Sequence, residues 1–393
     1  MSQEDVVIVA ARRTPIGAFQ GALSTVSATE LSAAATRACL ADTGMDSADI
    51  SHALIGCVLQ AGVGQAPARQ AALAAGLAQQ VDCTTINKVC GSGLRAATLG
   101  VDLLCAGTAS VVLAGGMESM SGAPYLLPKA REGYRMGHQQ VIDHMFFDGL
   151  TNAYDGEMMG TFGEATARRY SFSREQQDEF AVSSVERALA AASSGAFADE
   201  ITPVTVTTRK GETVVAQDEE PLRAKIDRIP TLRPAFAKDG TVTAASSSSI
   251  ADGAASLVLM TAAEAHRRKL DVLARVVGHS SHSHEPEWFT TAPVGAIRKL
   301  HEQVGWKPED VDLYEVNEAF ACVTMAAIHD IGLDRRRVNV NGGACALGHP
   351  IGASGARIVA TLVHALRHRG VKRGIAAICI GGGEALAIAL EAP

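Results

Sequence analysis

Short apolar runs alternate with longer amphipathic stretches along most of the chain. The runs are rich in valine, isoleucine and alanine, and they lie at residues 6–11, 53–56, 111–116, 253–260, 313–316 and 377–380. Between them, apolar positions recur with the spacing of a helix that covers one face of a sheet. This alternation predicts an α/β protein with largely parallel sheets that are buried on both faces.

The pattern near the start of the chain recurs near its end. A helix-like stretch stops at Gly44 and another stops at Gly305, 261 positions later, and each precedes a short polar segment and an apolar run. Similarly, Ser92 and Ser354 open helix-like stretches as Ser-Gly-x-Arg, 262 positions apart. Two nearly equal offsets indicate an internal duplication. We therefore expect two similar halves, each with its own sheet and covering helices.

Residues 121–243 do not fit this repeat. The segment is rich in proline and contains a helical pattern at 174–192 and a β-like run at 204–208. We interpret it as an insertion, after which the run at 253–260 returns to the first sheet. The predicted organisation is an N-terminal half over 1–120 completed by 244–270, an inserted loop domain over 121–243, and a C-terminal half over 271–393.

Composition and charge exclude several classes of protein. The chain has 393 residues, 20% of them charged, and a net charge of −7, which offers no general attraction for nucleic acid or an anionic membrane. Its apolar stretches fall short of the roughly 20 residues of a membrane span. The eight cysteines include no Cys-x-x-Cys pair, which argues against disulfides and zinc and favours a reducing compartment, for which we take the cytoplasm.

Cys90 is the first candidate for chemistry. It lies in the segment Val89-Cys90-Gly91-Ser92-Gly93, between an apolar run and a helical pattern. Unpaired N–H groups at a helix N-terminus lower the pKa of a thiol, and the neighbouring glycines let a substrate approach the backbone. The alternative is a buried structural thiol, which suits most cysteines.

Three further clusters change the weight of that alternative. Asn317–Phe320 follows an apolar run, a glycine-dense loop at 339–352 carries His349, and Cys379 ends a run that leads into three glycines. All lie at expected strand ends or helix starts, where open α/β sheets bind their ligands. The duplication predicts that Cys90 and His349 meet near a pseudo-twofold axis, because they precede equivalent helices.

A histidine-rich segment offers a weaker candidate. His279, His282 and His284 stand close enough in sequence to converge on a metal ion. No suitable acidic or thiol ligand except Glu285 stands beside them. We interpret the segment as a solvated loop and predict no metal site.

Taken together, these segments resemble the thiolases, most closely their short-chain members. The resemblance runs from residues 13–17 through 87–95, 115–120 and 317–320 to the segments around His349 and Cys379, in the family's order. It implies two similar layered α/β/α/β/α halves with an inserted loop domain.

The resemblance also implies a role for each catalytic candidate. Cys90 is the expected nucleophile that becomes acylated, His349 the base that forms its thiolate, and Cys379 the second cysteine that moves protons. Asn317 would hold a water that forms one oxyanion hole with His349. The N–H groups of Cys90 and Gly381 would form the other.

Further positions are expected to bind the coenzyme A thioester. The segment 241–249 resembles the family's pantetheine loop, although its four consecutive serines also suit a flexible linker. Three expected residues lie around the acyl group, namely Met159, Phe320 and Phe289. The others are Ser248, Phe236, Leu150 and Ala244 along the tunnel and Arg223 at the phosphates.

The implied reaction is the reversible Claisen condensation of two acetyl-CoA to acetoacetyl-CoA and CoA, with no permanently bound cofactor. The alternatives are a degradative 3-ketoacyl-CoA thiolase of broader chain length, a decarboxylating ketoacyl synthase, which Cys379 disfavours, and a non-catalytic acyl-CoA binding protein. Tolerance of a 2-methyl branch stays open because of Phe289. The stretch 124–149 resembles the loop that pairs dimers in short-chain thiolases, which predicts a homotetramer.

Overall fold

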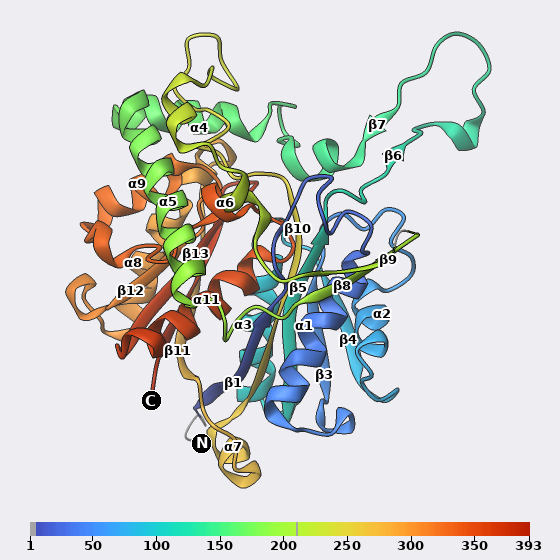
Figure 1. The fold of residues 1–393 in the computed structure, drawn as a ribbon, viewed down its shortest axis with the longest axis vertical. Coiled ribbons are helices and arrows are strands. Elements are labelled where there is room, and N and C mark those ends of the chain that lie inside the picture. Colours follow the sequence, from blue (N-terminus) through green and yellow to red (C-terminus); the bar gives the residue numbers. More distant parts are fainter. Residues whose placement is uncertain (1–4, 210) are drawn as a thin grey trace.

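The strands of the two expected halves join in a ten-stranded sheet, whereas we had expected a separate sheet in each half. The computed structural model describes residues 5–209 and 211–393. In strand order, one end of the sheet consists of β1 (Val6–Arg13), β10 (Ala251–Thr261), β5 (Val111–Ser119), β3 (His52–Gly56) and β4 (Asp82–Ile86), and β2 (Gly17–Ala18) pairs with β10. The other end consists of β11 (Ala274–Ser283), which pairs with β1, followed by β14 (Glu384–Glu391), β13 (Arg373–Ile380) and β12 (Leu313–Val316) (Figure 1).

The sheet is mixed, so the expectation of largely parallel sheets is wrong. Parallel pairs are β3 with β4, β3 with β5, and β12 with β13, whereas the pairs made by β1, β10, β11 and β14 are antiparallel. The connection from β13 to β14 shows the reason. It is the tight turn 381–383, in which Gly382 and Gly383 have φ of 94° and 88°, and so short a connection joins only antiparallel strands.

The repeated elements expected from the sequence form as α-helices with glycine caps. Helix α1 (Ala28–Thr43) ends at Gly44, α8 (Ala292–Val304) at Gly305 and α11 (Ser354–Arg369) at Gly370, each in the left-handed region. The remaining helices of the two halves are α2 (Pro67–Ala74), α3 (Ser92–Cys105), α7 (Ala262–Arg268), α9 (Ala321–Ile331) and α10 (Ala344–Leu347).

Helices α3 and α11 pack against each other at the centre of the molecule. They share one apolar core with strands from both ends of the sheet. A Cβ on Gly93 would lie 2.7 Å from the backbone N of Ala356, and one on Gly355 would clash with the backbone of Leu94. Gly93 and Gly355 are the equivalent glycines of the two repeats, 262 positions apart. Their reciprocal contact brings both helix starts together, as the duplication predicted.

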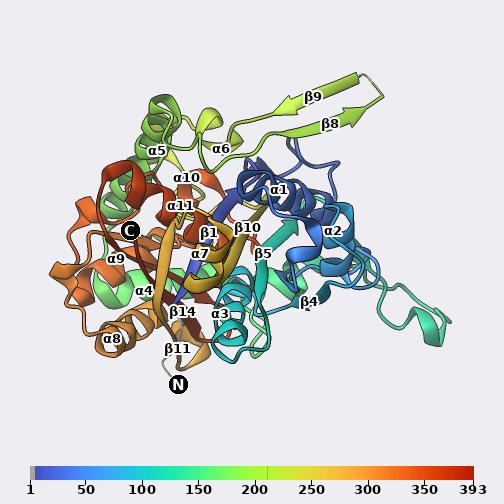
Figure 2. The same cartoon turned by 90° about the horizontal axis from the view of Figure 1, so that it is seen from below.

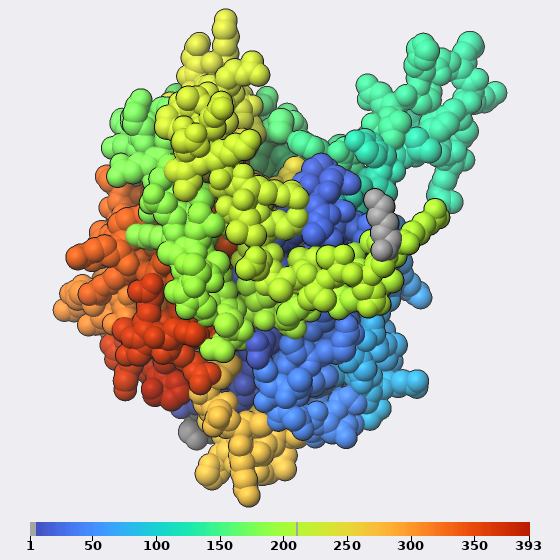
Figure 3. Space-filling view, viewed as in Figure 1, coloured from blue at the N-terminus to red at the C-terminus, as the bar shows by residue number. Residues whose placement is uncertain are grey.

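The segment between the repeats adds two projections and a helical cap. An arm with β6 (Tyr125–Leu126) and β7 (Ile142–Asp143) extends away from the body (Figures 1 and 3). The hairpin β8 (Val204–Thr208) and β9 (Gly211–Val215) lies beside α1 (Figure 2). The helices here are α4 (Met159–Tyr170), α5 (Arg174–Ser194) and α6 (Glu219–Arg223).

Short 3-10 and π-helical segments complete the chain. They are η1 (Ser47–Asp49), η2 (Ala130–Glu132), η3 (Met145–Leu150), η4 (Ile226–Thr231), η5 (Pro286–Thr291), η6 (Pro308–Asp310) and η7 (Arg335–Arg337). Among the described residues, no helix combines the length and hydrophobicity needed to cross a membrane.

Candidate active site

Cys90 sits on a tight turn between β4 and α3. The preceding residue, Val89, has φ of 45°, a left-handed conformation that costs a β-branched residue on the order of 1–3 kcal/mol. Ser92 holds the turn: its Oγ accepts from the N–H of Lys88 at 2.8 Å and donates to the carbonyl of Val89 at 2.7 Å. The Cys90 sulfur lies beside Gly381, the residue that follows β13.

The Cys90 thiol is neutral in this site. Burial raises its pKa to about 11, although the N–H groups of Gly381 and of Cys90 itself donate to the sulfur and oppose the rise. The expectation that the helix start lowers this pKa is therefore wrong, because desolvation of a thiolate outweighs the hydrogen bonds. The same two donors are, however, fixed at the sulfur, where an oxyanion beside it would also lie.

His349 presents a free lone pair. Its Nδ1 lies 2.5 Å from the Oγ of Ser354, which in turn donates to the carbonyl of Pro350 at 3.0 Å. Nδ1 is therefore the protonated nitrogen, and the buried Nε2 has no partner among the described residues. Burial, and then the charge of Arg357, lowers the pKa of His349 to about 3. The imidazole is neutral and able to accept a proton.

Cys379 and Asn317 are buried and do not line the cavity that contains Cys90 and His349. Cys379 is fully buried near the end of β13, and burial followed by the nearby Cys90 raises its pKa well above the usual value. Asn317 follows β12; its Oδ1 accepts from Arg357 at 3.3 Å, and its buried Nδ2 has no partner among the described residues. A buried amide group of this kind is suited to hold a water molecule.

One cavity of about 250 Å³ collects most of the expected site. Cys90, His349 and Gly381 line it. Its apolar wall includes Met159, Phe320, Phe289, Leu150 and Phe236, together with Ser248 and the previously unassigned Phe146, Met158 and Ile351. Nine of the residues expected from the sequence therefore line one cavity, whereas Cys379 and Asn317 do not line it.

The serine run is a packed loop, so the flexible-linker alternative is wrong. Both the N–H and the Oγ of Ser248 donate to the carbonyl of Ala319 at 3.0 Å. The carbonyl of Ser246 accepts from the N–H of Ala321 at 2.8 Å. These bonds tie the loop to the start of α9, beside Phe320.

Two expected residues do not reach the cavity. Ala244 is exposed and does not line it. Arg223 ends α6, where it pairs with Glu219 at 2.9 Å and remains about half exposed. A phosphate role for Arg223 stays a prediction.

Two buried carboxylates that were not singled out hold the loops of the site. Glu118 accepts from the N–H groups of Val58, Leu59 and Gly352 at 2.8–3.1 Å, and burial raises its pKa to about 7. Glu318 accepts from Ser184, Asn339 and the N–H of Cys345. The available signal was an acidic residue within an otherwise apolar segment, since a buried acid needs such partners.

We had expected the histidine-rich segment to be a solvated loop, and that expectation is wrong. His279 and His282 lie on β11, which pairs with β14, and the ring of His282 contacts that of His284. Residues 279–283 pair with residues 384–388 of β14, so the sheet continues through this segment.

Comparison with known proteins identifies the family. The family description "Thiolase, N-terminal domain" matches residues 6–263, and "Thiolase, C-terminal domain" matches residues 270–392. The chain belongs to the thiolase family. It is thus an acyltransferase, and the fold expected from the resemblance is confirmed.

Relatives and solved structures agree with this membership. An acetyl-CoA acetyltransferase of Pseudomonas aeruginosa is 48% identical over 98% of this chain and 99% of its own. A Rhizobium meliloti protein of the same name is 48% identical over the full length of both chains. The fold is similar to a thiolase from Ascaris suum in complex with coenzyme A (TM-score 0.94, 41% identity, 99% of this chain and 100% of the other). It is also similar to the Bacillus anthracis acetyl-CoA acetyltransferase (TM-score 0.97, 40% identity, 100% and 99%).

Proposed function

We propose that this thiolase is an acetyl-CoA C-acetyltransferase. It catalyses the reversible condensation of two acetyl-CoA molecules to acetoacetyl-CoA and CoA. One observation carries the proposal: a single small cavity holds a thiol, a neutral imidazole with a free lone pair, and fixed N–H donors at the sulfur. The names of the relatives support acetyl transfer. A binding protein would need none of these reactive groups.

In the first half-reaction, Nε2 of His349 takes the proton of the Cys90 thiol as the sulfur attacks the thioester carbonyl of acetyl-CoA. The negative oxygen accepts hydrogen bonds from fixed donors, which stabilise it by about 3 kcal/mol each in a dry site. The carbonyl re-forms, the CoA sulfur leaves with the proton of Cys379, which thereby becomes a thiolate, and acetyl-Cys90 remains. The carbon–sulfur bond made to Cys90 replaces the one broken to CoA.

In the second half-reaction, Cys379 acts as the base toward a second acetyl-CoA. Its thiolate removes a proton from the α-carbon, and the resulting enolate oxygen is stabilised by His349 and a water on Asn317. The carbanion attacks acetyl-Cys90, whose carbonyl oxygen faces the N–H groups of Cys90 and Gly381. Expulsion of the Cys90 thiolate, which takes back the proton held by His349, completes acetoacetyl-CoA and restores the enzyme. Division into two steps through a covalent intermediate lowers the barrier of carbon–carbon bond formation.

The aromatic wall limits the acyl chain, which tests the proposal. Phe320 packs edge-on to Phe236 and Phe289 to Phe162, and Phe289 is 3% exposed. Each added carbon pair must displace packed side chains at about 1–3 kcal/mol, which predicts a tenfold to hundredfold loss of kcat/KM. We expect this fall between acetoacetyl-CoA and 3-ketohexanoyl-CoA in a thiolysis assay, with 2-methylacetoacetyl-CoA the larger substrate best tolerated.

The variant Phe289→Ala provides the matched comparison, because it shortens this wall without touching the thiols or the imidazole. It should restore part of the six-carbon activity relative to four-carbon activity. Equal kcat/KM for four-carbon and ten-carbon substrates in the unaltered enzyme would favour the degradative alternative instead.

We also propose assembly into a homotetramer through the arm that carries β6 and β7. Its large apolar side chains are unusually exposed: Tyr125 66%, Leu127 56%, Met136 91% and Phe147 59%. Such a patch is typical of an interface, and identical arms from two dimers would meet with closed symmetry. Light scattering should give four times 40.8 kDa, and Met136→Asp combined with Leu127→Asp should yield dimers. A wild-type mass of one or two chains would contradict the tetramer.

The chemistry requires two free thiols, Cys90 and Cys379. All eight cysteines are unpaired in the structure. Because a reducing compartment preserves such thiols, we propose that the enzyme works in the cytoplasm.

A further inference from the structure

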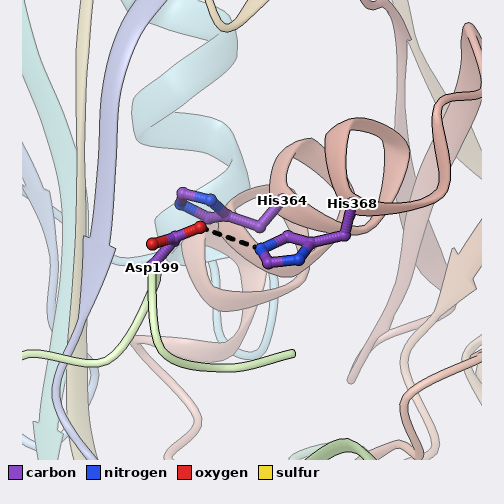
Figure 4. A group of neighbouring side chains, drawn as sticks. All are labelled: Asp199, His364 and His368. Carbon is purple, nitrogen blue, oxygen red and sulfur yellow. Dashed lines mark ion pairs between the residues drawn. The ribbon is translucent and has the colours of Figure 1, made fainter. Parts of the chain in front are cut away.

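Asp199, His364 and His368 converge at a cavity separate from the thiol cavity. One potential ligand atom from each residue lies within 4.8 Å of those of the other two. Figure 4 shows both histidines on α11, with Asp199 approaching from the loop before β8. The three residues line a cavity of about 690 Å³, none of whose lining residues belongs to the thiol cavity.

His364 already has the hydrogen bond that a metal-binding histidine needs. Its Nε2 donates to the backbone carbonyl of Ala11 at 2.8 Å, and the side chain is largely buried. This bond fixes the tautomer and leaves Nδ1, which has no hydrogen-bond partner among the described residues, as a lone-pair donor.

His368 and Asp199 supply the other two ligands. His368 follows His364 by one helical turn, so both rings project from the same face of α11. Its Nε2 lies 3.0 Å from Oδ2 of Asp199. Metal bonds of about 2.0–2.2 Å at a tetrahedral angle place two ligand atoms roughly 3.3 Å apart, so small side-chain rotations suffice.

The charges around the cavity allow a cation. Three acidic residues and three basic residues line it, namely Asp42, Asp199 and Asp271, and Arg12, Lys269 and Arg367. Arg12 is already engaged with Asp42 at 2.5 and 2.7 Å. The carboxylate of Asp199 therefore remains for the two imidazoles.

We propose that Asp199, His364 and His368 bind a divalent cation of the zinc class. Two imidazoles and one carboxylate form a donor set that zinc accepts, and the open side of the cavity leaves a fourth position for water. The bound ion would tie the segment between the repeats, through Asp199, to α11 and, through His364, to β1. Its effect is on stability, since the site lies apart from the reacting thiols.

The test is equilibrium dialysis of the untagged full-length enzyme against Zn²⁺, together with the absorption spectrum of the Co²⁺-loaded protein. We expect one site per chain, a nitrogen and oxygen ligand spectrum without thiolate bands, and loss of at least tenfold in affinity in both His368→Ala and Asp199→Asn. At a free Zn²⁺ concentration 100 times Kd, the unfolding equilibrium constant should fall about 100-fold in the unaltered protein.

The control is His279→Ala, which removes a histidine that pairs with Asp102 at 3.0 Å and is not one of the three residues of the proposed metal site. It should bind Zn²⁺ as the unaltered enzyme does. His368→Ala and Asp199→Asn alter exposed side chains, so both variants should fold. Unchanged affinity in these two variants, absence of Zn²⁺ binding, or thiolate bands in the Co²⁺ spectrum would overturn the proposal.

Discussion

Replacement of Cys90 by alanine should abolish acyl-enzyme formation and lower kcat by roughly four or more orders of magnitude, as expected when a nucleophile is removed. Radiolabelled acetyl-CoA should label one peptide of the unaltered enzyme, the one that contains Cys90. The variant should take up no label. The physical reason is that the sulfur of Cys90 lies in the cavity and accepts a hydrogen bond from the N–H of Gly381. A thioester carbonyl in the cavity can therefore contact both the sulfur and this N–H group.

Cys379→Ala should give the opposite division of effects. Acetyl transfer to position 90 should largely persist, because the nucleophile Cys90 and the base His349 are unchanged, whereas condensation and exchange of the α-proton should fall by about 10²–10⁴-fold. Single-turnover labelling and α-deuterium exchange separate the two steps. Cys105→Ala, which removes an exposed free thiol, is the control and should keep full activity. Label on the Cys379 peptide would reverse the two roles.

His349→Ala should slow acetylation of Cys90 by about 10²–10⁴-fold and change its dependence on pH. In the unaltered enzyme the imidazole has a pKa of about 3 and the thiol of about 11, so neither group titrates between pH 5 and 9. The acetylation rate should therefore be nearly flat over that range. Without the base only free thiolate attacks, so the variant's rate should rise about tenfold for each pH unit.

The variant Ser354→Ala distinguishes the presence of the base His349 from the orientation of its ring. It removes the partner of Nδ1 but leaves the imidazole, so we expect a smaller loss of rate with a flat pH profile. The measurement is the burst of acetyl incorporation under single-turnover conditions from pH 5 to 9. A His349→Ala enzyme that keeps a flat profile at the original rate would exclude His349 as the base.

Several features of the site could be predicted from local sequence. The nucleophile segment, the Asn317–Phe320 segment and the His349 loop each stand at a strand end or helix start, as their glycines and apolar flanks indicated. Met159, Phe320 and Phe289, which the resemblance placed around the acyl group, line the cavity. Glu118 and Glu318 were missed because their roles depend on distant backbone N–H groups.

The sequence by itself determined the duplication, the helix ends and the order of the chemical segments. Glycine caps and periodic apolar positions act over a few residues, and the near-constant offset of 262 positions places Gly93 opposite Gly355. Only the tertiary structure decided the antiparallel pairing of β1, β10, β11 and β14, the neutral state of the Cys90 thiol, and the convergence of Asp199 with His364 and His368. Strand direction, desolvation and long-range contacts depend on which distant segments pack together, and no local pattern encodes that.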